Sequence, residues 1–235
     1  MPELLNVLYV QTQGAFLSLE HDTVRIKVDD ETKLRVPLLR LSGIVVFGRV
    51  MLTPYLIQRC AEDGRSLVWM TGHGRFRGRL RGPTQGNVLL RRAQHTALSD
   101  GDHPRRIARQ IVAGKIHNSR NQILRSGRDT DDAADKAALA QAADRLADVL
   151  RRLEGTDDLN EVRGAEGEAA RAYFSVFNTM LRVDDEALTF KKRTRRPPRD
   201  PVNSVLSFLY ALLSAECASA EEGVGLDPQV GYLHG

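Results

Sequence analysis

Two glutamates lie two positions apart in the segment RGAEGEAARAYF, residues 163–174, which has the composition of a helix. At about 100° per residue, Glu166 shares a helix face with Tyr173 and Phe177, whereas Glu168 points to the opposite, polar side. A carboxylate on an apolar face costs free energy unless a metal ion or a hydrogen-bonded arginine pairs with it. Glu166 is therefore the candidate functional carboxylate. The alternative is that Glu166 lies in the first helical turn and is stabilised by the helix dipole.

An asparagine and a histidine further along the chain are the next candidates. In RDPVNSVLSFLYALLSAE, Asp200 is placed as the N-cap and Pro201 as the first helical residue of an apolar, buried type of helix. Asn203 is polar in its first turn, where it could act as a second cap. His234 comes much later than Glu166, so the two residues form a metal pair only if the fold brings them together.

Positive charge is concentrated in two parts of the chain, although the formal net charge is only +4. Residues 75–128 hold thirteen Arg and Lys and two Asp, whereas residues 129–170 hold twelve acidic and five basic residues. The segment KKRTRRPPR then adds Lys191, Lys192, Arg193, Arg195, Arg196 and Arg199. Separate basic blocks made mostly of arginine favour a polyanion such as nucleic acid as the partner. The alternative is a set of solvated faces and a flexible loop.

The pattern of apolar residues changes near residue 80. Before it, short segments have β-strand character: NVLYV, AFLSL, TVRIKV, TKLRVPL, GIVVFG and SLVWM. One short helix interrupts them, with Thr53 as its N-cap and Pro54 at its first position. After it, helical patterns cover residues 87–98, 103–126, 131–153, 157–182 and 201–220.

These patterns predict an α+β fold, in which a β-rich N-terminal domain of antiparallel sheets with one short helix precedes an all-α C-terminal domain. We place the two domains at residues 1–80 and 88–235. A basic Gly- and Arg-rich linker at residues 81–87 joins them. It ends the segment GHGRFRGRLRGPTQGN, which is typical of either a linker or a hairpin.

The composition indicates a cytoplasmic protein. Two cysteines, Cys60 and Cys217, provide neither a disulfide framework nor a thiolate metal cluster. The first residues lack the basic segment of a signal peptide, and no apolar run is long enough to span a bilayer. We therefore expect no membrane partner.

Three segments resemble, in order, the successive blocks of the family of CRISPR-associated protein one: RGAEGEAARAYF, RRPPRDPVNSVLSFLYALL and GLDPQVGYLHG. Together they cover residues 160–235. The β-rich N-terminal domain and the basic early helices also agree with the layout of that family. Its members are metal-dependent integrases and endonucleases that insert new spacers into CRISPR arrays.

The resemblance implies a metal site. In the family, the Glu of the R-G-x-E-G block and the His of the last block hold Mg²⁺ or Mn²⁺ together with an Asp further on. Glu166 and His234 are therefore the implied catalytic and metal-binding residues. The resemblance also implies that the catalytic domain and its third ligand extend past residue 235, so we expect little activity from these 235 residues alone. The implied reaction is a transesterification, in which the 3′-hydroxyl of a prespacer attacks a phosphodiester of the repeat.

The resemblance also implies partners. Double-stranded DNA, as prespacer and CRISPR repeat, would contact Arg163, the six basic residues of KKRTRRPPR and Asn203. A second copy of the chain would bind through residues 1–80, and CRISPR-associated protein two would bridge such dimers. Two other functions stay open, namely a nucleic-acid-binding module without catalysis and an unrelated metal-dependent hydrolase or structural helical protein.

Overall fold

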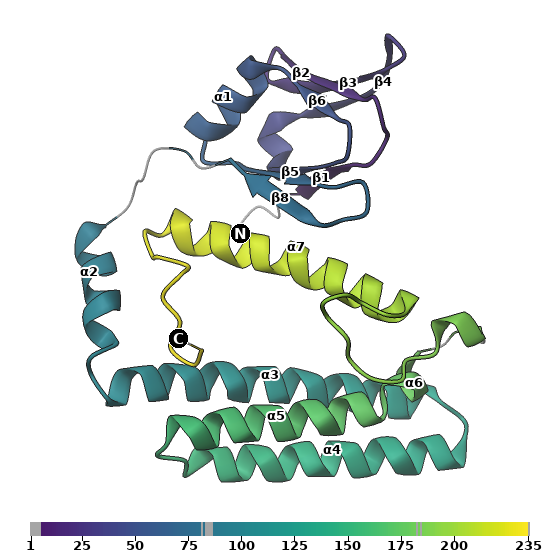
Figure 1. The fold of residues 1–235 in the computed structure, drawn as a ribbon, viewed down its shortest axis with the longest axis vertical. Coiled ribbons are helices and arrows are strands. Elements are labelled where there is room, and N and C mark those ends of the chain that lie inside the picture. The colour runs from purple at the N-terminus through teal and green to yellow at the C-terminus, as the bar shows by residue number, and fades with distance from the viewer. Residues whose placement is uncertain (1–5, 81, 83–86, 182, 184, 235) are drawn as a thin grey trace. The chain divides into compact units, whose positions relative to one another are not determined.

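The computed structural model describes residues 6–80, 82, 87–181, 183 and 185–234. Its strands are β1 (Asn6–Val10), β2 (Phe16–Glu20), β3 (Thr23–Val28), β4 (Glu31–Pro37), β5 (Leu41–Phe47), β6 (Met51–Leu52), β7 (Ser66–Met70) and β8 (Phe76–Arg79). Its helices are α1 (Pro54–Glu62), α2 (Val88–Ala97), α3 (Asp102–Asp129), α4 (Ala133–Glu154), α5 (Leu159–Ser175), α6 (Phe177–Met180) and α7 (Pro201–Gly223), with short 3₁₀ turns η1 (Leu38–Arg40) and η2 (Glu186–Leu188). Strands precede helices along the chain, apart from α1, as Figure 1 shows. The predicted α+β fold class is confirmed.

Contacts between residues divide the chain into two units. The first unit comprises Met1–Val88 and Phe208–Pro228, and the second comprises Leu89–Ser207 and Gln229–Gly235. Helix α7 is unbroken, yet its first turns belong to the second unit and the rest belongs to the first. The predicted domain boundaries stay a prediction. Most of the predicted linker, residues 81 and 83–86, lies outside the described residues.

The sheet that contains β5 is mixed, which corrects the prediction of antiparallel sheets. Its strand order is β1-β5-β7-β8, with β1 and β7 parallel to β5 and β8 antiparallel to β7. Strands β5 and β7 run in the same direction because α1 carries the chain back between them. The uninterrupted apolar run IVVF of β5 is buried on both faces, as expected for a strand in a covered parallel sheet.

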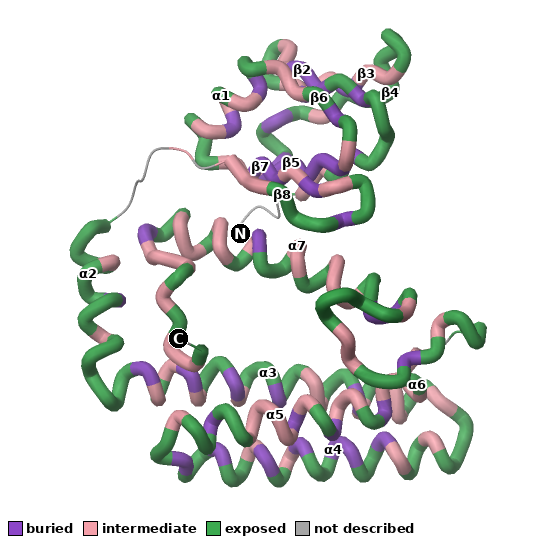
Figure 2. Tube along the Cα trace, in the orientation of Figure 1, coloured by how far each residue is buried: buried purple, intermediate pink, exposed green. Residues whose placement is uncertain are grey.

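Two apolar clusters cover the two faces of this sheet within the first unit. On one face, Ile44, Val46 and Leu67 pack with residues of β2, β3 and α1, among them Leu17, Val24, Leu56 and Cys60. On the other face, Val45, Phe47, Val68 and Met70 pack with Phe208, Leu212 and Ala215 of α7. An ion pair of 2.7 Å between Arg79 Nη2 and Glu222 Oε1 also joins β8 to α7. Figure 2 shows the buried residues along these strands.

The second sheet has the order β4-β3-β2-β6 and presents one face to solvent. In β3, Val24 and Ile26 are buried whereas the intervening Arg25 is half-buried, and the outer strand β4 is mostly exposed. The strict alternation of VRIKV predicts one buried and one solvated face, and the burial along β3 alternates accordingly, although Arg25 and Lys27 on the outward face are only partly exposed.

Local signals in the first unit act as predicted. The Thr53 side chain accepts a hydrogen bond of 3.4 Å from Leu56 N, and Pro54 begins α1. Of the two alternatives for the Gly- and Arg-rich segment, the structure shows the hairpin for its first part. The antiparallel pair β7–β8 turns through residues 71–75, where Thr71 Oγ1 accepts a hydrogen bond of 2.9 Å from Arg75 N.

Helices α3, α4 and α5 run alongside one another in the second unit (Figure 1). Their facing sides supply one apolar core, which includes Val112, Ile116, Ile123, Leu139, Leu146, Val149, Leu153 and Val162. Aspartate N-caps start two of them, since the Asp132 side chain accepts from Asp135 N and the Asp158 side chain accepts from Asn160 N. The helices predicted at residues 103–126 and 131–153 are therefore present, whereas the single helix predicted at residues 157–182 is interrupted at Val176 and forms α5 and the short α6. The register of α3 and α5 sets which of their side chains meet.

Helix α7 is long and apolar enough to cross a membrane by length and composition alone. A single helix of this kind is weak evidence for a membrane span. From the sequence we expect no apolar run long enough to span a bilayer, whereas α7 is apolar on average over its length although Asn203, Ser204 and Ser207 interrupt it. The absence of a membrane partner stays a prediction.

Candidate metal centre and nucleic-acid interface

Glu166 lies on α5 at the border of the buried face. The buried residues of this helix are Val162, Ala169 and Ala172. On the helical wheel, the centre of this buried face lies about 70° away from Glu166. Of the two aromatic residues that defined the apolar face in the sequence, Tyr173 is half-buried on α5, whereas Phe177 lies beyond the end of α5 and begins α6. The Glu166 side chain keeps 24% of its surface exposed, against 46% for Glu168. The two carboxylates differ in the predicted direction, although Glu166 is not fully buried.

Each of the two carboxylates pairs with a cation from another helix. The ammonium group of Lys115, on α3, donates a hydrogen bond to Glu166 Oε1. On the other flank of α5, Arg152 Nη2 of α4 donates to Glu168 Oε1 at 2.7 Å. Glu166 differs from Glu168 in having a second basic neighbour, because His234 Nε2 lies 3.7 Å from Glu166 Oε2. The fold therefore does bring together the Glu and the His that lie far apart in the sequence.

The segment that carries His234 is held by residues of the second unit. Arg163 Nε donates to the carbonyl oxygen of Leu233 at 2.7 Å, and Leu233 packs against the apolar core of α3, α4 and α5. The Tyr232 hydroxyl donates to the carbonyl oxygen of Gln94 on α2 at 3.3 Å. Arg163, a predicted nucleic-acid-binding residue, thus positions the backbone next to His234.

The Glu166 and His234 ligand atoms lie close to the spacing that one divalent ion requires, but do not match it. Two ligand atoms about 2.1 Å from an octahedral ion lie about 3.0 Å apart when adjacent and about 4.2 Å apart when opposite. The separation between Glu166 Oε2 and His234 Nε2 is 3.7 Å, so a shift of about 0.5–0.7 Å would bring both atoms to one ion. A carboxylate oxygen with an imidazole nitrogen is a donor set suited to Mn²⁺ and also to Mg²⁺. Among the residues that the structure describes, no group of three or more potential ligands gathers, so these two supply part of a coordination shell.

Asn203 organises the predicted DNA-binding loop from inside. It is fully buried, and its Oδ1 accepts hydrogen bonds of 2.9 Å from both Thr194 N and Arg193 Nη1. Its Nδ2 donates to the carbonyl oxygen of Lys192 at 2.8 Å and to Asp200 Oδ2 at 2.6 Å. One amide therefore holds three consecutive loop residues against the start of α7.

Asp200 caps α7 as predicted. Its Oδ1 accepts a hydrogen bond of 2.7 Å from Asn203 N. This backbone hydrogen bond, together with the Asn203 side chain and the nearby Arg193 guanidinium, lowers the pKa of the Asp200 carboxyl. Asn203 is thus the capped residue and not a second cap.

The basic residues of the loop fall into two groups. Arg193 turns inward and donates from Nη1 to Asn203 Oδ1, to the carbonyl oxygen of Thr194 at 2.7 Å and to Ser207 Oγ at 3.2 Å. The exposed group, which can meet a phosphate backbone, consists of Lys191, Lys192, Arg195, Arg196 and Arg199.

Residues that the sequence did not single out fix the start of this loop. Phe190 is buried, and its ring stacks on Phe174 of α5 with centroids 5.4 Å apart. Asn178 brackets the backbone of Phe190, accepting from its N at 2.7 Å and donating to its O at 2.6 Å. Lys115 was also missed. Its signal in the sequence is weak, because a lysine in a basic helix gives no sign of the carboxylate it will meet.

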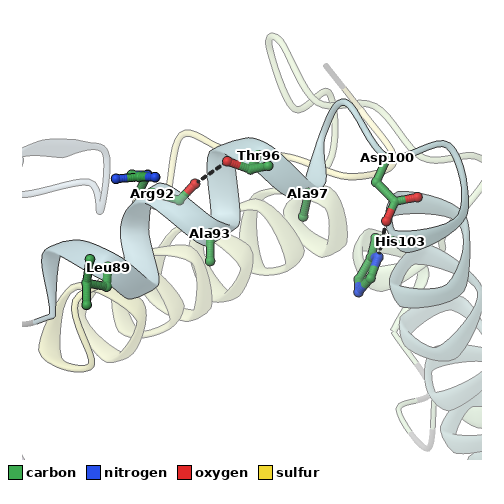
Figure 3. A pocket seen from close by; sticks show the side chains of 7 residues that line it. All are labelled: Leu89, Arg92, Ala93, Thr96, Ala97, Asp100 and His103. Atoms are coloured by element: carbon green, nitrogen blue, oxygen red, sulfur yellow. Dashed lines mark hydrogen bonds and ion pairs between the residues drawn. The ribbon is translucent and has the colours of Figure 1, made fainter.

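A surface hollow of about 450 Å³ lies elsewhere in the second unit, between α2 and the start of α3. Figure 3 shows its lining, which includes Arg92, Thr96 and an Asp100–His103 pair with 2.5 Å between Oδ2 and Nδ1. None of the predicted site residues lines it. The chemistry of the candidate site is therefore carried by Glu166, His234 and the basic loop.

Comparisons with known proteins identify the family of the chain. The family described as "CRISPR associated protein Cas1" matches residues 8–235. The CRISPR-associated endonuclease Cas1 1 of Moorella thermoacetica is 52% identical over 98% of this chain and 67% of its own length. The protein of the same name from Chlorobaculum tepidum is 45% identical over 100% of this chain and 68% of its own length. The chain thus spans about two thirds of these relatives, both of which are named endonucleases.

Solved structures have the same fold. A Cas6-RT-Cas1–Cas2 complex matches 100% of this chain and 25% of its own chain, with a TM-score of 0.76 and 24% identity. A casposase bound to integration product matches 98% of this chain and 65% of its own, with a TM-score of 0.73 and 23% identity. At these identities the structures show the fold alone. Together with the family match and the close relatives, they show that this chain belongs to the CRISPR-associated protein Cas1 family.

Proposed function

We propose that this chain carries the metal-binding and DNA-binding residues of an integrase and endonuclease of CRISPR adaptation. The reaction is the insertion of prespacer 3′-hydroxyl ends into the repeat by transesterification. The observation that carries the proposal is the approach of His234 Nε2 to within 3.7 Å of Glu166 Oε2 across a long stretch of intervening chain. The names of the relatives, which are CRISPR-associated endonucleases, support the same reaction class.

Glu166 and His234 would hold the divalent ion, Mg²⁺ or Mn²⁺. When bound, the ion supplies Lewis-acid polarisation of a phosphoryl oxygen and stabilises negative charge on the attacking and leaving oxygens. Arg163 fixes the Leu233 carbonyl and so sets the direction from which His234 approaches Glu166. The third ligand implied by the family resemblance would come from the part of the family's length that these 235 residues do not span.

The loop at residues 191–199 would bind the DNA backbone. Its five exposed cations give affinity without reading bases, because lysine and arginine contacts to phosphates position a duplex but carry no sequence information. The internal hydrogen bonds of Asn203 keep this loop ordered before DNA arrives. Such preorganisation reduces the entropy that binding must otherwise overcome.

The partners follow from the same proposal. A second copy would bind through the β-rich residues 1–80, whose sheet edges need cover. CRISPR-associated protein two would join such dimers, and the fold neighbour named as a Cas6-RT-Cas1–Cas2 complex supports this. We propose a cytoplasmic location for the protein, because its proposed substrates are DNA.

The test is half-site integration of a labelled prespacer into a supercoiled repeat plasmid with Mg²⁺ or Mn²⁺, using the chain extended to the length of its relatives. Replacing Glu166 with Gln should reduce the product to the level without metal, and Glu168→Gln is the matched control on the same helix. Wild-type integration by the Glu166→Gln variant would contradict the proposal. Salt-dependent DNA binding without any metal-dependent cleavage or integration by the wild type would favour the second candidate, a non-catalytic nucleic-acid-binding module.

A further inference from the structure

Lys115 occupies the candidate metal carboxylate in this structure. It lies within α3, between the exposed Gly114 and the buried Ile116, so its backbone is fixed by the helix core. Its side chain is 52% exposed and reaches across to donate to Glu166 Oε1. The other oxygen of the same carboxylate faces His234. Both oxygens of Glu166 therefore have a basic neighbour before any metal is added.

The chemistry of this pair differs from that of its counterpart on the same helix. Glu168 pairs with Arg152, whose planar guanidinium suits a lasting contact with a carboxylate. Glu166 pairs with a lysine, a compact point charge on a flexible stem that is held less rigidly. An exposed ion pair of either kind adds little to stability. Stability therefore gives no reason to place a lysine at the carboxylate that faces His234.

We propose that Lys115 is a positioning residue that holds Glu166 in the metal-free protein, yields this carboxylate to the divalent ion, and then donates to a phosphate of the bound DNA. The inference rests on the proposed function, because it takes Glu166 and His234 as metal ligands. A lysine ammonium and a divalent ion repel each other at one carboxylate. The ion therefore displaces the ammonium, which is left with positive charge next to the place where a phosphodiester must bind.

The surroundings leave the ammonium room to move. The Lys115 side chain is 52% exposed, so its ammonium borders solvent. At the neighbouring Gly114, no other segment of the described chain comes within 4 Å of the position that a Cβ would take. The side chain can therefore swing away from Glu166 on this side of α3.

The proposal predicts that removing the Lys115 charge has two effects on metal binding: higher affinity for the metal without DNA, and a smaller gain in that affinity when DNA is added. Without DNA, removing the Lys115 charge removes a competitor for Glu166, so metal should bind more tightly. With DNA, the phosphate gives the wild-type ammonium a new acceptor, so DNA should strengthen metal binding more in the wild type than in a variant without that ammonium. Coupling of this kind is reciprocal, so metal should likewise strengthen DNA binding more in the wild type.

The experiment is a titration of the chain extended to the length of its relatives with Mn²⁺, in which electron paramagnetic resonance reports free Mn²⁺, with and without a short DNA duplex. The variants are Lys115→Met and Lys115→Gln, with Arg152→Met as the matched control and Glu166→Gln as the ligand variant. We expect both Lys115 variants to bind Mn²⁺ about threefold to tenfold more tightly without DNA, and to gain less from DNA than the wild type does. Arg152→Met should match the wild type.

The outcomes separate the two proposals. If the wild type binds Mn²⁺ and Glu166→Gln weakens this binding, but the Lys115 variants match the wild type with and without DNA, the role of Lys115 is wrong and the metal site stands. If Mn²⁺ binding does not depend on Glu166, the proposed function fails and the inference about Lys115 fails with it. Far-ultraviolet circular dichroism of each variant checks that the helices are intact.

Discussion

Replacing Asn203 with Ala should unfold the basic loop and destabilise the second unit. Asn203 is fully buried, and its side chain makes hydrogen bonds with Thr194 N, Arg193 Nη1, the Lys192 carbonyl oxygen and Asp200 Oδ2. Alanine can make none of these bonds. Three successive loop residues are then no longer held against α7.

The expected cost can be worked out from the groups left behind. Two of the partners, Thr194 N and the Lys192 carbonyl oxygen, are backbone groups that lose their hydrogen bond to Asn203 in the variant. A hydrogen-bonding group left unsatisfied costs about 1–3 kcal/mol, with the lower end for groups that water can reach. The two together predict a fall of about 2–4 kcal/mol in the free energy of unfolding. That is a large part of the roughly 5–15 kcal/mol that is usual for a protein.

Urea denaturation followed by circular dichroism measures this change. Ser204→Ala is the matched control, because its Oγ is an exposed donor to the Asp200 carbonyl oxygen at 3.0 Å and its removal should cost less than about 0.5 kcal/mol. DNA affinity of Asn203→Ala should fall as well, although no charge is removed. A free energy of unfolding within about 0.5 kcal/mol of the wild type would refute the reasoning that this amide holds the loop.

Three further predictions concern charge and reactivity. Replacing Arg195 or Arg196 with Ala should weaken DNA binding with little sequence preference and lower the slope of log K against log salt by about 0.9 for each phosphate that the variant no longer neutralises, and an unchanged slope would show that the replaced arginine does not touch DNA. The lowered pKa of Asp200 adds stability that is fully present above the ordinary value of about 3.9 and is lost as the pH falls through the lowered value. In Asp200→Asn, the free energy of unfolding measured by urea denaturation should therefore depend less on pH in that range. Burial raises the pKa of the Cys60 thiol to about 11, so at about pH 8 a thiol reagent should label the exposed Cys217 and leave Cys60 unlabelled until the protein unfolds.

Local features of the fold could be predicted from the sequence, because their physical causes lie within a few residues. The cap at Thr53, the proline that begins α1 and the alternation in β3 each depend on neighbours along the chain. The parallel pairing of β5 could not be predicted in this way, because it depends on where the chain returns after α1. The buried run IVVF carried the relevant signal, since a strand covered on both faces does not alternate.

The candidate site shows the same limit. The helical wheel separated Glu166 from Glu168 in the right direction, but the partner of Glu166 is a lysine on another helix, which no periodicity reveals. From the sequence, Asn203 is predicted to contact DNA, whereas its hydrogen bonds to Thr194 and Lys192 in the structure are internal, so we expect it to act on DNA binding through the loop that it holds. The pairing of Glu166 with His234 was implied by the family resemblance and not by the residues themselves.

Helix α7 is synthesised much later than the sheet that it covers, and this delay has a consequence for folding in the cell. The sheet face formed by Val45, Phe47, Val68 and Met70 leaves the ribosome about 140 residues before Ala215 of α7, which covers it. At roughly 5–20 residues per second, this face waits about 7–30 s for its cover. During that time it is an exposed apolar surface on a nascent chain, which is the kind of surface that chaperones bind.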